Sequence, residues 1–269
     1  MRKALQFVAA ITLAITLPML FLAPADAQDG ARIHLIHGIP GVDVDVEAGG
    51  ENVFEGFSFG DTQDLSGLAG ATLEGLKVKA AGTDTVAIDA GDVELPASGN
   101  FTVIAHLGAD GTPTLGVFEN DVSTIDAGEG RLTVRHTAAA PEVDILANGE
   151  AAFSGVANGA GGTVDLPAGT ISASVVPAGE TEPVVIGPAD LTIAEGSHLL
   201  VYAVGSLDDD TLTVLTESID GLHSNPDRID TGNSIPQDGS NAALLLLVAG
   251  IAAAAGAGTL VVARNRAQA

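Results

Sequence analysis

The run in this sequence that most resembles a catalytic motif is short and rich in glycine. Gly56-Phe57-Ser58-Phe59-Gly60 matches Gly-x-Ser-x-Gly, a pattern that places a serine nucleophile on a strand-to-helix turn. No helix signal follows the run, and a similar segment later in the chain has Ala157 where Ser58 stands. We therefore interpret the match as coincidence and expect no catalytic residue, so the protein is predicted not to be an enzyme.

Two histidine–aspartate pairs recur along the chain. His37 precedes Asp43, and His136 precedes Asp144. A histidine beside an acid could relay a proton or bind a ligand. Each histidine, however, flanks one predicted strand and each aspartate lies on the next, so a hydrogen bond that pins the two strands explains the recurrence without a reaction. We predict this structural role, and no His-x-x-x-His or cysteine spacing indicates zinc.

Carboxylates gather in two places that could hold a hard cation. The first group lies on one face of a predicted strand and the second in a predicted loop: Asp43, Asp45 and Glu47, and Asp208, Asp209 and Asp210. Calcium prefers six to eight oxygen ligands, often from convergent loops. Neither group has the Asp-x-Asp-x-Asp-Gly spacing, so a solvated acidic surface is favoured. A calcium site is the alternative, and no other cofactor is expected.

The charge of the chain excludes one class of function. The formal net charge is −25, and residues 28–240 carry 34 acidic and 6 basic side chains. Nucleic-acid binding needs Lys and Arg to displace counterions, so we expect no nucleic-acid partner. Carbohydrate binding is also disfavoured, because the chain has no Trp and a single Tyr. With no Cys, each domain must be held together by a full-sized core.

The N-terminal residues 1–27 have the features of a signal peptide. Arg2 and Lys3 precede an apolar stretch over 4–22, and Ala25-Asp26-Ala27 supplies small residues for cleavage before Gln28. The alternative is an uncleaved N-terminal anchor, because the apolar stretch is long for a signal peptide. In either case the sequence predicts export.

A second apolar block predicts a membrane anchor near the C-terminus. Residues 242–262 carry no charge, and the predicted transmembrane helix spans 241–263. Arg264 and Arg266 follow at once, so the tail 264–269 is expected in the cytoplasm and the preceding domains outside.

Two further features accompany this anchor. Residues 221–240 are rich in breakers and lack periodicity, and we predict a flexible stalk there. Gly250, Ala254 and Gly258 fall at four-residue spacing, which would let two helices approach closely. Self-association through the membrane helix is therefore an open alternative.

The region between the two apolar ends contains an internal repeat. Residues 30–125 resemble 129–220 at a shift of about 97–99 positions, with Val42-Asp43-Val44 matched to Val143-Asp144-Ile145 and two extra residues in the second copy. The predicted domains are therefore 28–126 and 127–220.

Each copy has the patterning of a β-domain. Apolar and polar residues alternate over 42–47 and 76–80, as in half-buried strands. Residues 199–204 are apolar throughout, which suits a central strand covered on both faces or one packed against the neighbouring domain. With about six or seven strands in each copy, the sequence predicts two tandem immunoglobulin-like β-sandwiches.

Both copies resemble the bacterial and archaeal domain of unknown function 4397. The shared features are an Arg and a His on the first strand, a Pro-containing turn, and then Val-Asp-aliphatic: Arg32, His37, Pro40 and Val42-Asp43-Val44, then Arg131, His136, Pro141 and Val143-Asp144-Ile145. Gly60 and Gly159, and Leu68–Gly70 and Leu166–Gly169, extend the likeness. The first copy is expected to have a shortened turn over 38–41. The resemblance implies tandem, exported, β-rich domains and transfers no catalytic residue.

The sequence therefore favours a non-enzymatic cell-envelope protein that presents two β-domains to another protein or to a surface. The alternative is an ectodomain that binds a cation, such as calcium, or a small ligand.

Overall fold

The computed structural model describes residues 30–223, which form sixteen strands. The first repeat holds β1 Arg32–His37, β2 Val44–Ala48, β3 Glu51–Phe57, β4 Thr62–Asp64, the 3-10 turn η1 Ser66–Leu68, β5 Thr72–Ala80, β6 Val86–Glu94, β7 Asn100–Leu107 and β8 Pro113–Glu119. The second holds β9 Glu129–His136, β10 Val143–Ala147, β11 Glu150–Val156, β12 Gly161–Pro167, β13 Gly169–Pro177, β14 Ile186–Ile193, β15 His198–Val204 and β16 Thr213–Ile219.

Each repeat is a sandwich of two four-stranded sheets. The sheet orders are β4-β1-β7-β8 and β3-β2-β5-β6 in the first repeat, and β12-β9-β15-β16 and β11-β10-β13-β14 in the second. The predicted all-β sandwich is thus confirmed, with eight strands in each copy instead of six or seven. The extra strands include β4, which has three residues and therefore too few for a visible alternation.

The strand order differs from the predicted immunoglobulin-like one. In an immunoglobulin constant domain the first two strands share a sheet, whereas here β1 and β2 lie in different sheets. In addition, β1 pairs with β7 in parallel, as β9 does with β15, while the other strand pairs are antiparallel. Sequence periodicity reports which residues face a core but not which strands are neighbours, so this order could not be read from it.

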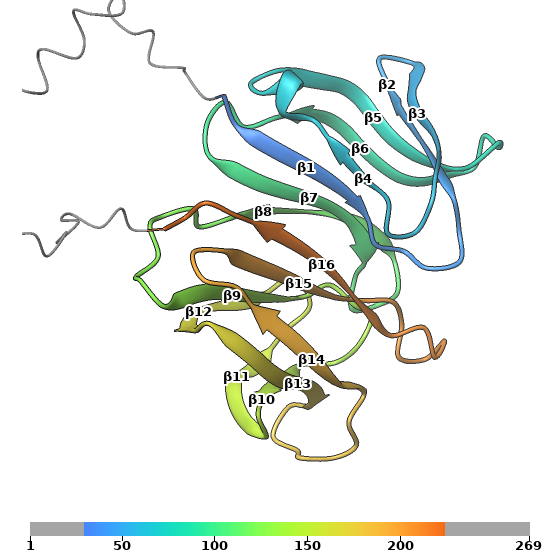
Figure 1. Ribbon diagram of the computed structural model, residues 1–269. Coiled ribbons are helices and arrows are strands. Elements are labelled where there is room, and N and C mark those ends of the chain that lie inside the picture. The colour runs from blue at the N-terminus through green and yellow to red at the C-terminus, as the bar shows by residue number, and fades with distance from the viewer. Residues whose placement is uncertain (1–29, 224–269) are drawn as a thin grey trace, which may run out of the picture. The chain divides into compact units, whose positions relative to one another are not determined.

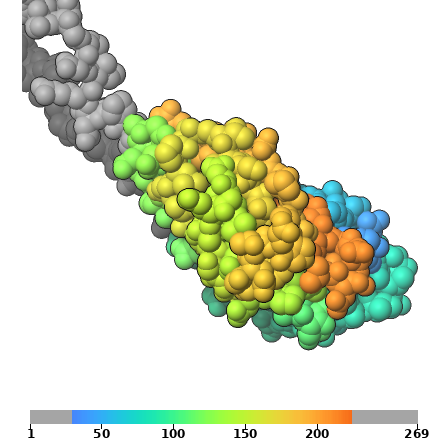
Figure 2. Space-filling model, turned by 90° about the horizontal axis from the view of Figure 1, so that it is seen from below, coloured from blue at the N-terminus to red at the C-terminus, as the bar shows by residue number. Residues whose placement is uncertain are grey.

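An apolar layer joins the two repeats. It contains Ile36 and Ile104 from the first repeat and Leu200, Tyr202 and Val204 from β15. Figure 1 shows β7 and β8 beside β15 and β16, and Figure 2 shows the orange strands of the second repeat against the blue and cyan surface of the first. The remaining sheet of each repeat covers its own core on the opposite side, so the four sheets form four layers.

The apolar run over 199–204 has the environment that its sequence predicts. Val201 packs in the core of the second repeat, whereas Leu200, Tyr202 and Val204 point into the layer between repeats. Central strand β15 is therefore covered on both faces, one of them by the neighbouring repeat.

Arg135 links the two repeats by polar contacts at the edge of this apolar layer. Its guanidinium donates to the Glu119 carbonyl at 2.9 Å and to Asn120 Oδ1 at 2.8 Å, both in the first repeat. It also donates to the Tyr202 hydroxyl at 2.8 Å and lies 4.6 Å from the centroid of the Phe118 ring. Arg135 is buried, so these acceptors satisfy a cation that has lost its water.

Residues 30–223 contain both cores and the layer between them, and each of the sixteen strands pairs within this range. They meet the requirements of a self-contained folding unit. Within this unit no helix has the length and apolar character that a membrane crossing requires.

The predicted signal peptide at 1–27, transmembrane helix at 241–263 and tail at 264–269 lie outside the described residues, as does the predicted stalk beyond residue 223.

Candidate functional site

A buried carboxylate on β2 clamps two glycine turns in the first repeat. Asp45 Oδ1 accepts from the Gly56 backbone N–H and Oδ2 from that of Gly82, both at 2.8 Å. Both glycines have positive φ, at 63° and 70°, which a larger side chain rarely adopts. The N–H groups of Gly82 and Gly56 stabilise the charged form and hold the pKa of Asp45 below its usual value, with help from the charge of Lys79.

The second repeat builds the same clamp on Asp144. Its carboxylate accepts from the Gly155 N–H at 2.7 Å and from the Gly179 N–H at 2.9 Å. The partner of Asp144 in the first repeat is therefore Asp45, and the predicted match to Asp43 is wrong. The segment from His37 to β2 is as long as that from His136 to β10, so neither extra residues nor a shortened turn distinguish the copies.

The paired histidines have backbone partners instead of the predicted aspartates. His37 Nε2 donates to the Val42 carbonyl at 2.7 Å, and His136 Nε2 donates to the Pro141 carbonyl at 2.9 Å. The predicted His37–Asp43 and His136–Asp144 hydrogen bonds are not formed: Asp43 is exposed and precedes β2, and both Asp144 oxygens serve the glycine clamp. Each buried histidine closes its own loop, and burial lowers the pKa of His136.

The candidate cation ligands already have partners or stand apart. Asp45 serves the clamp, and Glu47 accepts from Lys79 Nζ at 2.5 Å. The loop residues Asp208, Asp209 and Asp210 are exposed in the turn between β15 and β16. Over residues 30–223, no group of three or more His, Cys, Asp or Glu side chains is placed to hold a metal ion.

Ser58 does not lie on a strand-to-helix turn. It follows β3 in the turn that leads to β4, where its backbone N–H donates to Asp61 Oδ2 at 2.9 Å. The next element is a strand, so the geometry that activates a serine nucleophile in the Gly-x-Ser-x-Gly motif is absent at this position.

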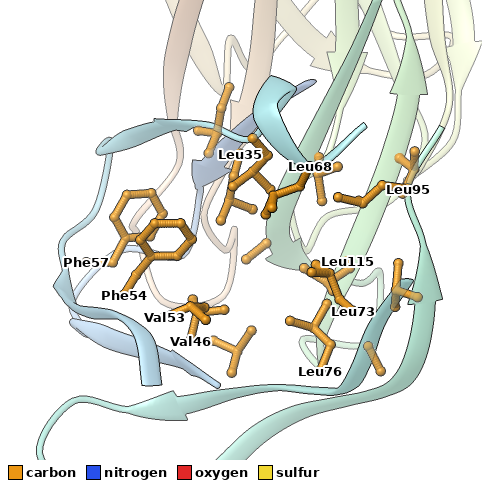
Figure 3. Close-up of a pocket in the computed structure, with 18 of the residues that line it drawn as sticks. Leu35, Val46, Val53, Phe54, Phe57, Leu68, Leu73, Leu76, Leu95 and Leu115 are labelled. Atoms are coloured by element: carbon orange, nitrogen blue, oxygen red, sulfur yellow. The ribbon is translucent and has the colours of Figure 1, made fainter. Parts of the chain in front are cut away.

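The most distinctive feature of the first repeat is an apolar cavity of about 360 Å³ between its two sheets. Figure 3 shows its walls, with Phe54 and Phe57 on one side and Leu73, Leu76 and Leu115 on the other. All but one of the lining residues are apolar, and the exception is Glu94 on β6. The volume falls within the range of about 300–1,000 Å³ that is typical of small-molecule pockets.

The cavity reaches the surface of the domain. Three of its apolar lining residues are also exposed: Val53 by 48%, Leu68 by 43% and Val117 by 55%. A ligand that covers exposed apolar side chains at the rim of the cavity removes their surface from water. This favours entry of the ligand.

One edge of the first repeat differs from the same edge of the second. Strand β4 pairs with β1 over three residues, and the chain then turns through η1, which carries Leu68 to the cavity. In the second repeat β12 pairs with β9 over seven residues, from Gly161 to Pro167. The edge strand of the second repeat therefore lines the full length of its sheet, whereas that of the first stops early and leaves a short turn over the cavity.

The corresponding cavity in the second repeat measures about 30 Å³. At two inward positions the side chains of the second repeat are smaller, so they do not account for this difference. The partners of Phe57 and Leu76 in the second repeat are the smaller Val156 and Ala173. The sheets of the first repeat therefore enclose more space, although Phe57 and Leu76 are larger than their partners.

The tandem repeat has a match among known families. The family described as "Domain of unknown function (DUF4397)" matches residues 31–146 and 137–236. The chain belongs to the DUF4397 family. The two matches confirm the tandem arrangement of DUF4397 domains, and no curated protein matches the chain.

The residues of the cavity in the first DUF4397 domain were not predicted as a site from sequence. Phe54, Phe57 and the leucines gave no signal of a site, because a side chain that lines a void has the same apolar pattern as one that fills it. One sequence signal could have indicated that the edge of this domain is irregular. Residues 60–68, which end at Leu68, show no clear alternation, and here β4 is short and η1 forms.

Proposed function

We propose that this DUF4397 protein is a non-enzymatic envelope protein whose first domain binds a small apolar ligand. The cavity of about 360 Å³ is the observation that supports ligand binding. Export and membrane attachment belong to the proposal through the apolar segments at 1–27 and 241–263. Presentation of the two domains to a protein or surface partner stays a prediction from the sequence.

The size of the cavity limits the ligand. An apolar cavity of about 150 Å³ stays dry and takes up benzene. By proportion, a cavity of about 360 Å³ holds roughly a dozen carbon atoms. A ligand of this size gains about 25 cal/mol for each Å² of apolar surface that leaves water. Water is bound only weakly in the cavity, because it finds few hydrogen-bond partners among the lining side chains.

The chain offers a simple optical test, because it has no Trp. The variant Leu68→Trp places a single indole at the rim of the cavity, where a bound ligand would shield it from water. Residues 28–240 with this substitution are titrated with 1-decanol, and tryptophan emission is followed. We expect a blue shift that saturates at one decanol for each protein.

Two substitutions that fill the cavity from opposite sheets provide the decisive comparison. Ala105→Phe on β7 and Ala90→Phe on β6, each combined with Leu68→Trp, should abolish the saturable shift while circular dichroism shows a folded protein. The matched control is Val86→Trp, because Val86 is 44% exposed on β6 but does not line the cavity. A shift that persists in both filled variants, or that Val86→Trp reproduces, would overturn the proposal.

A further inference from the structure

Two turns of the second repeat are longer than their counterparts in the first. Residues 178–185 connect β13 to β14, whereas 81–85 connect β5 to β6. Residues 205–212 connect β15 to β16, whereas 108–112 connect β7 to β8. Each turn therefore has eight residues in the second repeat and five in the first. Turns that exceed what the shared frame requires are positions where binding residues specific to one copy are expected.

The two longer turns together form a groove of about 280 Å³ on the second repeat. The groove is lined by four aliphatic side chains and one carboxylate: Val184, Val185, Leu207, Leu212 and Asp210. Val184 is 41% exposed and Leu207 is 38% exposed. Exposed apolar side chains that gather in a groove indicate a surface that a partner covers, because covering them removes apolar area from water.

The turn that carries Leu207 is held in place by hydrogen bonds. The Leu207 N–H donates to the Ala139 carbonyl at 3.0 Å, which ties the turn to the loop before β10. Within the turn, the Ser206 N–H donates to Thr211 Oγ1 at 2.9 Å, and the Thr211 N–H donates to the Ser206 carbonyl at 3.0 Å. A groove that is already formed loses little conformational entropy on binding, so a few apolar contacts suffice for affinity.

The charge around the groove indicates the chemistry of its partner. Residues 127–223 carry 14 acidic side chains and 2 basic ones, and both basic residues are buried arginines. Asp208, Asp209 and Asp210 are exposed at the groove, and none of them forms an ion pair within the described part of the chain. The surface of the second repeat therefore attracts a cationic partner and repels an anionic one.

We propose that this groove is the docking site for a segment of a partner protein in which apolar side chains are flanked by lysine or arginine. The apolar side chains occupy the groove, and the flanking cations lie over the carboxylates at its rim. An apolar centre with a polar rim is the usual arrangement of a protein interface. A second copy of this chain would be repelled, because its own surface is equally acidic. The inference concerns the second repeat and does not depend on the ligand proposed for the first.

Three fluorescein-labelled heptapeptides test the two parts of this chemistry. The first has a Leu-Val-Leu centre with two lysines on each side, the second has a Ser-Gly-Ser centre instead, and the third has glutamates in place of the lysines. Each is titrated with residues 28–240 at low ionic strength while fluorescence anisotropy is followed. We expect saturable binding of the first peptide and at least about fivefold weaker binding of the second. The third should not bind, because like charges repel.

Two double variants locate the binding at the groove. Val184→Ser with Leu207→Ser removes apolar surface from both turns and should weaken binding of the first peptide about fivefold. Asp208→Asn with Asp210→Asn removes two charges from the rim and should weaken it about threefold. All four positions are exposed, and circular dichroism checks that the variants are folded.

Each double variant has a matched control away from the groove. Val86→Ser with Val122→Ser changes two valines that are 44% and 42% exposed, and Glu150→Gln with Asp190→Asn removes two exposed charges from the second repeat. Both controls should leave the affinity for the first peptide unchanged. The tested residues do not line the cavity of the first repeat, so the decanol titration remains a separate experiment.

Four results would overturn the docking proposal. They are a first peptide that does not bind saturably, a second that binds as tightly as the first, a third that binds at all, and controls that weaken binding as much as the groove variants. Sedimentation gives a further test: a dimer of residues 28–240 that Leu207→Ser dissociates would assign the groove to self-association instead.

Discussion

The first repeat encloses about 360 Å³ between its sheets, whereas the second encloses about 30 Å³. Both use the same strand order, the same loop-closing histidine and the same aspartate clamp. The difference lies at one edge, where β4 has three residues and β12 has seven. A shared frame can therefore carry a filled core in one copy and a cavity in the other, because the frame is held by polar contacts outside the core.

The comparison of the two repeats first predicts that the aspartate clamp stabilises both of them. Asp144→Ala leaves the N–H groups of Gly155 and Gly179 without their acceptor. Hydrogen bonds to charged groups contribute about 1.5–3 kcal/mol each, so this variant should lower the free energy of unfolding by roughly 3 kcal/mol. Asp45→Ala should also destabilise the protein. Urea unfolding of residues 28–240 measures both, and an unchanged midpoint in either variant would show that the frame does not depend on the clamp.

The cavity itself predicts opposite effects for one substitution at two matched positions. Val103 and Val201 occupy the same place on β7 and β15, and each lines the cavity of its own repeat. Val201→Phe overpacks a filled core and should cost about 1–3 kcal/mol. Val103→Phe has room for the larger ring and should cost little or increase stability. The same urea experiment measures both, and an equal loss in the two variants would contradict the difference in core filling.

The two repeats also differ where they meet. The position of Arg135 in the second repeat is occupied by Ile36 in the first, and Ile36 lies in the apolar layer between repeats. Arg135→Ile would leave the Glu119 carbonyl and Asn120 Oδ1 without their donor, which should cost about 1–2 kcal/mol.

Arg135→Lys tests whether the fork of the guanidinium matters, because lysine keeps the charge without the planar set of donors. We expect a similar loss, measured by thermal unfolding. If Arg135→Ile leaves the melting temperature unchanged, the polar link between repeats adds nothing to the apolar layer.

Many of the strands could be predicted, because buried residues recur at every second position along a half-buried strand. The alternation at 42–47 and the apolar run at 199–204 reflect faces that are covered in the structure. The same alternation led to the wrong match of Asp43 with Asp144, since Val42-Asp43-Val44-Asp45-Val46 repeats itself every two residues and fits the second copy in two registers. The hydrogen bonds of Asp45 to Gly56 and Gly82 decide between the registers.

The cavity could not be predicted in this way. Phe57 and Leu76 are apolar and point inward, as core residues do, and their sequence positions say nothing about the distance between the sheets. That distance depends on how the edge near η1 closes, which is a property of strand pairing. Likewise, the buried Arg135 follows no apolar pattern, because its environment is supplied by the other repeat.

The smallest predicted difference between the repeats is a pH effect at the first residue of β15. His198 is buried, with Nδ1 donating to the Asp121 carbonyl at 3.0 Å and Nε2 2.7 Å from Thr133 Oγ1. Burial lowers the pKa of His198 from 6.5 to about 4, and the nearby Arg131 and Arg135 add to the decrease. The matching residue of the first repeat is Asn100, which does not titrate.

The sign of this effect follows from the lowered pKa. The unfolded chain takes up a proton on His198 near pH 6.5 while the folded chain does not, so stability falls as pH decreases from 6.5 toward 4. Between about pH 7.5 and 5.5 the loss from this residue is about 1 kcal/mol. His198→Asn, which introduces the residue of the first repeat, should flatten that part of the profile even if the variant is less stable overall. Urea midpoints at the two pH values measure the slope. Parallel slopes for the two proteins would mean that other groups, such as the buried His106 and His136, cause the pH dependence instead.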